Sequence, residues 1–535
     1  MSFKKGVVSV VCLILAGSLP AGAQIEDSGL ELVNPWGMSF LEAGEPSLPT
    51  DMWRASDADD LLPLMRDVRT HDLTPAERTL MQRMALSPAT PPAGMQEPLL
   101  RAERARIMYD LGEAQAAATL MARLDTPPPG LDADEIVADL NLALGNEATA
   151  CDMLNAPDRL SGYWAKLRAV CAALQGNTAG AELAIEMALQ QDAVDSWLLA
   201  AVFATSGELP DAPEADYSSG LNLAISAEAG LTPPEAPVPA NRPDLAAAMA
   251  LHPKLPITLR VQSAGMASQA GMLETDDYQA LFLKLISEPG FVPSTPLESA
   301  LYAARDPLVT DEDRAFALAA ALEGAMDTPA HFSAVARLLW EDVERLPINT
   351  FTAANAPIFA RAALATDHYT AAKDWSSANT MEGAREDGSF DAALMSALVT
   401  LAGSETTRNA SDYIGERLAT LAESDLQKQT AARLFALWTA LGIAPPADAR
   451  RLIVNAPERK STPEIDLQLV GVLASAEADA AGEVILSTVG MTKGDPTALD
   501  DASLLLLLKA LQRIGAEDAA REMALESTGY WKALN

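Results

Sequence analysis

Aromatic residues, cysteine, histidine and positive charge are all scarce in this chain of 535 residues. Only 5% of the residues are aromatic, and the alternation of Val, Ile and Thr with polar residues that is typical of strands is missing. Apolar residues nevertheless make up 49% of the chain, with alanine and leucine dominant. Because alanine has the highest helix propensity and lets helices approach closely, the composition predicts an all-α protein with a large core.

Basic residues are outnumbered by acidic ones, 38 to 74, which gives a formal net charge of −36. Binding to nucleic acid requires clustered Lys and Arg against the phosphates, and attraction to an anionic membrane surface requires the same. We therefore expect no nucleic-acid partner. The acidity is interpreted as a source of solubility, with a cationic ligand or partner as the alternative.

One sustained hydrophobic run is present, and it lies at the N-terminus. Two lysines precede the apolar segment 6–19, and the small-residue motif Ala-Gly-Ala follows it. This is the pattern of a secretory signal peptide over residues 1–23, cleaved between Ala23 and Gln24. The run is short for a bilayer span, and no later segment has a transmembrane pattern. We expect an exported protein, periplasmic if the cell has an outer membrane.

Composition changes along the chain predict its organisation. Residues 24–55 carry Gly and Pro at short intervals without a helical period, which indicates an extended N-terminal arm. Helical patterning follows over 56–231 and again over 244–535. Between these two segments lies 232–243, with five prolines in twelve residues, which is typical of a stiff linker. The sequence thus predicts two helical-repeat arrays, arranged either as two lobes or as one kinked superhelix.

A helical break recurs at a near-constant interval. Gly112, Gly145 and Gly176 are separated by 33 and 31 residues, and an alanine follows each of them five positions later. Similar breaks occur toward the C-terminus, at Gly442 and Gly515. A glycine lets the backbone turn at the end of one helix, and a small residue lets the next helix pack closely. Since one helical hairpin cannot bury its apolar face alone, we expect stacked hairpins with Gly176 between two helices.

This repeat resembles the tetratricopeptide-repeat-like, α-solenoid superfamily of exported bacterial proteins. The turn and second-helix positions of that family's pattern are matched by Gly176, Asn177, Ala181, Ile185 and Ala188. The first helices lack the family's regular Trp, Leu, Gly and Tyr set, and the unit length drifts. The resemblance implies an α-α superhelix of stacked helical hairpins and, often, a protein or peptide partner. It implies no active site.

The sequence contains no motif for catalysis, metal binding or nucleotide binding. Its histidines, His71, His252, His331 and His368, lie far apart, and none has a second ligand-type residue at metal-binding spacing. We expect surface or capping roles for them. No phosphate-binding glycine loop and no nucleophile elbow occur. The prediction is therefore no catalytic residue, no bound metal and no cofactor.

Two functions are compatible with these observations. The first is an exported, non-catalytic scaffold or adaptor that binds a protein or peptide partner in the cell envelope, since stacked hairpins present extended binding surfaces. The alternative is an all-α enzyme acting on cell-wall or exported polysaccharide. Such an enzyme needs an aromatic platform beside two carboxylates, and Trp340, Trp375 and Trp438 are the residues that could gather to form it. Enzymatic activity is left open, with the scaffold favoured.

Two cysteines remain once the signal peptide is removed, Cys151 and Cys171. Cys151 falls on the second helix of one predicted hairpin and Cys171 on the first helix of the next, and these helices are neighbours in a stack. Disulfides persist in the oxidising compartment that an exported protein meets. We predict a structural disulfide between Cys151 and Cys171, with two buried free thiols as the alternative.

Overall fold

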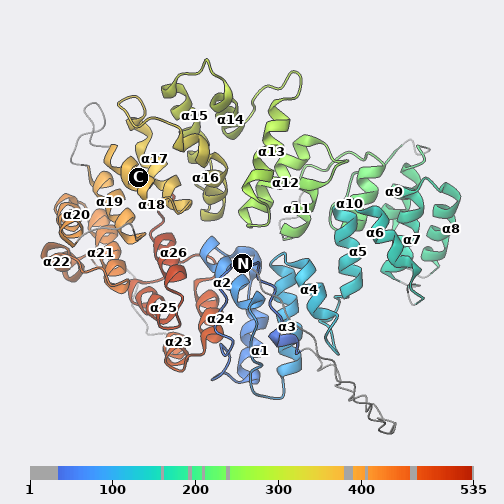
Figure 1. The fold of residues 1–535 in the computed structure, drawn as a ribbon, viewed down its shortest axis with the longest axis horizontal. Helices are drawn as coiled ribbons and strands as arrows, with labels where there is room; N and C mark the ends of the chain where they lie inside the picture. Colours follow the sequence, from blue (N-terminus) through green and yellow to red (C-terminus); the bar gives the residue numbers. More distant parts are fainter. Residues whose placement is uncertain are drawn as a thin grey trace, which may run out of the picture. The chain divides into compact units, whose positions relative to one another are not determined.

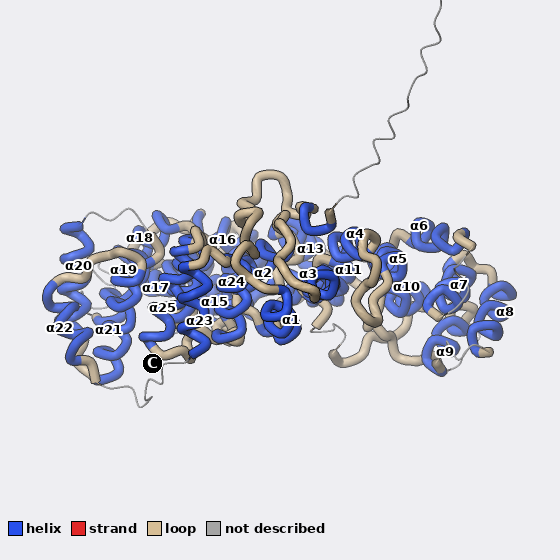
Figure 2. The backbone as a smooth tube through the Cα atoms, turned by 90° about the horizontal axis from the view of Figure 1, so that it is seen from below, coloured by secondary structure: helices blue, strands red, loops and turns tan. Residues whose placement is uncertain are grey.

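The computed structural model describes residues 34–532 apart from eight internal gaps. The gaps are 158, 160–161, 191–194, 208–210, 237–240, 379–388, 404–407 and 458–466. Within the described residues the chain forms 26 α-helices and no strand, with one isolated bridge between Asp57 and Ala93. Figure 2 shows the same chain as helices and loops only. The predicted all-α class is confirmed. The predicted signal peptide 1–23 and its cleavage site lie outside the described residues.

The helices follow one another with short connections. The first thirteen are α1 (Ala58–Asp67), α2 (Pro75–Leu86), α3 (Glu97–Asp110), α4 (Ala114–Met121), α5 (Ala133–Ala143), α6 (Glu147–Asp152), α7 (Tyr163–Leu174), α8 (Thr178–Leu189), α9 (Ser196–Ala204), α10 (Gly220–Glu228), α11 (Pro243–Leu251), α12 (Ile257–Gln269) and α13 (Thr275–Ile286). The last thirteen are α14 (Pro296–Arg305), α15 (Asp311–Glu323), α16 (Pro329–Glu344), α17 (Ala356–Ala365), α18 (Tyr369–Ala378), α19 (Phe390–Leu401), α20 (Arg408–Leu421), α21 (Asp425–Ala440), α22 (Ala447–Asn455), α23 (Leu467–Glu477), α24 (Ala481–Thr492), α25 (Asp501–Arg513) and α26 (Glu517–Ser527). Four short 3-10 helices interrupt the connections: η1 (Pro35–Gly37), η2 (Thr70–Asp72), η3 (Met153–Asn155) and η4 (Ala353–Asn355).

Consecutive helices pack as hairpins, most closely in the pairs α7–α8, α11–α12, α14–α15 and α17–α18 (Figure 1). Gly176 lies between α7 and α8 with φ of +68°, so its predicted place between two helices is confirmed. Gly112 and Gly145 take the same left-handed conformation in their turns. Asp367 and Asp479 adopt it between α17 and α18 and between α23 and α24, without a glycine. The turn therefore depends on the backbone conformation, which glycine adopts at least cost.

The alanines five residues after these glycines are buried where paired helices approach. Ala117, Ala150 and Ala181 are each at most 2% exposed. A larger side chain at these positions would push the second helix of the hairpin away from its neighbours. The small-residue spacing in the sequence therefore corresponds to close helix packing.

Buried apolar side chains form two clusters. The smaller lies within residues 138–259 and includes the hairpin α7–α8, whereas the larger joins residues 36–136 to residues 250–531. The larger cluster thus draws on both the first and the last helices of the chain. The proline-rich segment 232–243, predicted as the boundary between two arrays, falls partly outside the described residues, and the predicted boundary stays a prediction.

The first helices pack against the last ones. α1 and α2 contact α24, and α2 also contacts α26 (Figure 1). Trp53 lies over Gly482 of α24, where any Cβ would overlap its indole ring. The Gly482 N–H donates to the carbonyl of Met52 at 3.2 Å, and the Ser56 hydroxyl donates to Glu483 at 2.9 Å. Segments more than 400 residues apart in the sequence are therefore joined directly.

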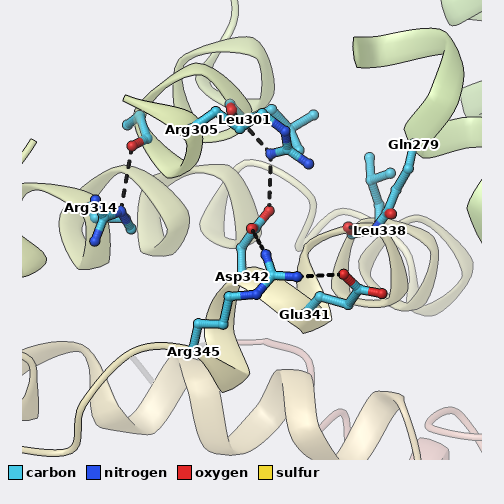
Figure 3. A network of polar contacts seen from close by, with 9 residues as sticks. Gln279, Leu301, Arg305, Arg314, Leu338, Glu341, Asp342 and Arg345 are labelled. Carbon is cyan, nitrogen blue, oxygen red and sulfur yellow. Dashed lines mark hydrogen bonds and ion pairs between the residues drawn. The ribbon is translucent and has the colours of Figure 1, made fainter. Parts of the chain in front are cut away.

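One buried carboxylate ties neighbouring hairpins together (Figure 3). Asp342 on α16 pairs with Arg305 of α14 at 3.2 Å and with Arg345 at 3.0 Å. Its side chain is only 4% exposed, so both arginines serve as its counter-ions. Gln279 of α13 donates to the carbonyl of Leu338 at 3.1 Å and adds a second polar link to α16.

Among the described helices, none combines the length and the apolar character needed to cross a bilayer.

Candidate functional site

A cavity of about 430 Å³ lies where segments from the beginning, middle and end of the described chain meet. η2 and the start of α2 form one part of its wall, α11, α12 and α16 form another, and the turn after α24 closes it. Its polar lining includes His71, Asp72, Arg78, Asn241, Gln269 and Lys493. We call it the junction cavity.

Backbone geometry brings two of these segments together. Lys493 ends α24 in the left-handed conformation with φ of +49°, and Gly494 follows with φ of +81°. A Cβ on Gly494 would overlap the backbone carbonyl of Asp72. Only glycine allows the turn after α24 to approach η2 this closely, and this approach places Lys493 and Asp72 in the same wall.

Three helices begin at the junction cavity: α2, α11 and α16. Each has proline in its first turn, which fixes the helix start and needs no hydrogen-bond acceptor for its nitrogen. Thr74 and Thr328 cap α2 and α16 with their side chains. The partial positive charge of the helix N-termini favours carbonyl or anionic groups in the cavity.

Arg78, Asp72 and Asp110 of the junction cavity are engaged with the protein itself. Arg78 donates to the carbonyl of Thr70 at 3.2 Å, and burial lowers the pKa of its guanidinium. Burial also raises the pKa of Asp110, against its ion pair with Arg106. Asp72 pairs with His71 at 3.1 Å. Asp110 and Asp72 thus each have a partner of their own within the protein. The cavity therefore offers hydrogen-bond donors and acceptors to a ligand, without a pair of residues arranged for acid–base catalysis.

The histidines have separate environments. His331 pairs with Asp327 at 2.7 Å, and His368 stacks on Trp340 with ring centroids 4.3 Å apart. His252 occupies the C-terminal cap of α11 and is fully buried. Burial lowers the pKa of His252 to about 4, so its ring is neutral at pH 7. In the described part of the chain, no group of three or more His, Cys, Asp or Glu residues is placed to hold a metal ion.

The tryptophans named as an aromatic platform are dispersed in the core. Trp340, Trp375 and Trp438 are at most 6% exposed, and none of them lines the junction cavity. Trp375 packs on Phe359 at 5.0 Å, and the Trp438 indole N–H donates to the carbonyl of Ala397 at 3.1 Å. They do not gather into a surface that could stack a sugar ring.

Carboxyl groups with raised pKa values gather at the seam between α2 and α26. Glu526 accepts a hydrogen bond from the N–H of Ala76 at 2.9 Å, so α26 caps the start of α2. Burial raises the pKa of Glu526 to about 8 and that of Glu522 to about 7. Burial also raises the pKa of Glu77, which completes the capping box with Thr74. The role of Glu526 is not visible in the sequence, because its partner lies 450 positions away and no local motif marks it.

Cys151 at the end of α6 and Cys171 on α7 are joined by a disulfide, with a Cα–Cα distance of 5.7 Å. The bond links consecutive hairpins inside the smaller apolar cluster. No C-x-x-C spacing accompanies it, so it is assigned a structural role and not a redox one. The other sequence-predicted positions, Ala23 and Gln24, lie outside the described residues.

Comparison with protein-family models, with curated proteins and with solved structures finds no match to this chain. The fold therefore defines the class only as an all-α protein of stacked helical hairpins, and the resemblance to the tetratricopeptide-repeat-like superfamily stays a hypothesis based on the turn pattern.

Proposed function

We propose that the protein is an exported, non-catalytic scaffold that binds a protein or peptide partner in the cell envelope. The observation that supports this most is the junction cavity. Its volume of about 430 Å³ accommodates a short segment of chain, and ligand sites in proteins span roughly 300–1,000 Å³. A peptide backbone presents N–H and C=O groups in alternation. A lining with amide, hydroxyl and charged groups of both signs, together with three helix starts, suits such a ligand.

The alternative, an enzyme acting on polysaccharide, has less support. The tryptophans that could bind sugar rings are in the core, and Glu526, whose pKa is raised to about 8, caps the start of α2 and does not line the junction cavity. The location in the cell envelope follows from the predicted signal peptide over residues 1–23.

Affinity capture from the producing cell's envelope tests the proposal with a cavity-filling variant. Gln269 lines the junction cavity at the end of α12, and Gln269→Trp places an indole inside it. Gln115→Trp adds the same side chain on the exposed surface of α4 and is the matched control. We expect wild type and Gln115→Trp to retain the same partner and Gln269→Trp to lose it, with all three proteins equally folded by circular dichroism. Equal recovery of that partner by Gln269→Trp would contradict the proposal.

A further inference from the structure

A second cavity, of about 380 Å³, lies between α17, α19, α21 and the C-terminal end of α26. Among the described residues that line it, three are basic, Arg361, Arg433 and Lys532, and none is acidic. In a chain with 74 acidic and 38 basic residues, a lining with basic and no acidic side chains has the opposite charge to the chain as a whole. We call this cavity the cationic pocket.

Arg361 is the unbalanced charge in the cationic pocket. Its Nε is buried and donates to no hydrogen-bond acceptor, and no ion pair joins its guanidinium to a carboxylate of the described chain. Burial lowers the pKa of Arg361, while the negative charges of Asp391 and Glu323 raise it from a greater distance. Arg361 is half-buried, and a partly desolvated cation without a close counter-ion is destabilising, so a bound anion would reduce that penalty.

Arg433 differs from Arg361 because the protein holds it in place. It pairs with Asp501 at 2.9 Å and donates to the carbonyls of Leu499 at 3.0 Å and Pro496 at 3.1 Å. It therefore forms a fixed part of the wall, already balanced by Asp501. Lys532 is exposed at the rim, with its ammonium 5.4 Å from the Trp531 ring, and adds a second positive charge at the opening.

The remaining lining combines leucines with hydroxyl groups. Leu394 and Leu398 of α19 and Leu434 of α21 form an apolar wall. The hydroxyl of Ser527 donates to the carbonyl of Ala524 at 2.7 Å, and that of Thr528 donates to Leu525 at 2.6 Å. Because both hydroxyl protons are engaged, these oxygens can act only as acceptors toward a ligand, which favours a ligand that carries N–H donors.

The geometry points to a ligand that carries an anion, an aliphatic group and N–H donors together. We propose that the cationic pocket binds the free carboxyl terminus of a polypeptide ending in aliphatic residues, with the carboxylate on Arg361 and the side chains against the leucines. An aliphatic carboxylate such as a fatty acid would use Arg361 and the leucines but offer no donor to Ser527 and Thr528. The proposal concerns a site separate from the junction cavity and names the chemistry of its ligand.

Peptide titration of the exported protein tests this inference. The probes are acetyl-Ala-Leu-Leu with a free carboxylate, the same peptide as its C-terminal amide, and decanoate. We expect the free-acid peptide to bind at least tenfold more tightly than the amide and more tightly than decanoate. Arg361→Gln should abolish the preference for the acid, whereas Arg123→Gln, which removes an exposed arginine in the turn after α4, should leave it unchanged.

Other results would overturn the assignment. Equal affinity for the free-acid peptide and its amide would show that the pocket does not recognise the carboxylate. Binding of decanoate without binding of the peptide would assign the pocket to an aliphatic acid. Failure of all three probes to bind would also count against it. Should Arg361→Gln not fold, Lys532→Gln at the exposed rim provides the second variant. It is expected to lower the affinity for the free-acid peptide about threefold and to leave the affinity for the amide unchanged. Loss of partner capture in Gln269→Trp has no bearing on these titrations, so the two proposals fail separately.

Discussion

Single residues with positive φ determine where the hairpins turn. Gly176 has φ of +68°, and a Cβ built on it would meet nothing within 4 Å. Space is therefore available for a side chain at this position, and only the backbone conformation disfavours one. A non-glycine residue with φ in this left-handed range costs on the order of 1 kcal/mol. Asp367 and Asp479 adopt the same conformation in their own turns and already include this cost.

Gly176→Ala should therefore lower the free energy of unfolding by about 1 kcal/mol through backbone strain alone. Gly471 is the matched control, because it lies inside α23, has no positive φ, and a Cβ built on it would meet nothing within 4 Å. Gly471→Ala should raise the free energy of unfolding by about 0.5–1 kcal/mol, since alanine favours helix interiors. Urea denaturation measures both, and the same sign for the two variants would refute this account of the turns.

The disulfide between Cys151 and Cys171 leads to a second prediction at this scale. Thiol titration of the unreduced, denatured protein without the predicted signal peptide should detect no free thiol, because the third cysteine lies in that peptide. Reduction should destabilise the protein by about 3 kcal/mol, since the bond closes a loop with a sequence separation of 20. The double variant Cys151→Ala, Cys171→Ala should match the reduced wild type. Two free thiols per chain in the unreduced protein would rule the bond out.

At the scale of elements, the seam between α2 and α26 combines a predictable feature with an unpredictable one. The capping box of Thr74 and Glu77 could be predicted, because its residues are three positions apart and their pattern is local. The contribution of Glu526 could not, because a hydrogen bond to Ala76 across 450 positions leaves no trace in local spacing. The start of α2 is therefore completed only when α26 docks against it.

This seam should make stability fall as pH rises. Burial raises the pKa of Glu526 to about 8 and that of Glu522 to about 7, above the usual value near 4.5. Protonation thus favours the folded state, so the stabilisation is fully present below about pH 4.5 and is lost as pH rises through 7 to 8. Urea denaturation at pH 5.5, 7 and 8.5 should show this fall.

Glu526→Gln should remove much of the pH dependence, because glutamine has no proton to lose. Glu517→Gln, an exposed change on the same helix, is the control and should leave the slope as in wild type. If the free energy of unfolding of Glu526→Gln depends on pH as in wild type, the seam does not control the stability in this pH range.

At the scale of the whole molecule, the hairpin stack could be predicted and its closure could not. The turns at Gly112, Gly145 and Gly176 follow from spacings within about 35 residues, and their local physical causes are visible in sequence. The contact of Trp53 with Gly482 and the convergence of segments on the junction cavity depend on the accumulated geometry of many hairpins. Neither leaves a periodic signal.

Gly482→Ala tests the closure between the first and last helices. Its Cβ would overlap the Trp53 indole, so Trp53 must leave its place in the core, and we expect a loss of about 3 kcal/mol in the free energy of unfolding. Gly490→Ala on the same helix has open space around it and should be neutral or slightly stabilising. Equal stability of the two variants would mean that α24 does not hold the N-terminal arm.

The central claim is that a polypeptide partner occupies the junction cavity, and site-specific photocrosslinking tests it most directly. A photoreactive amino acid is placed at position 269, inside the cavity, and separately at position 115, on the exposed surface of α4. After irradiation of intact producing cells, the account predicts one discrete protein adduct from position 269 and none from position 115. Adducts of equal yield from both positions, or from position 115 alone, would contradict it.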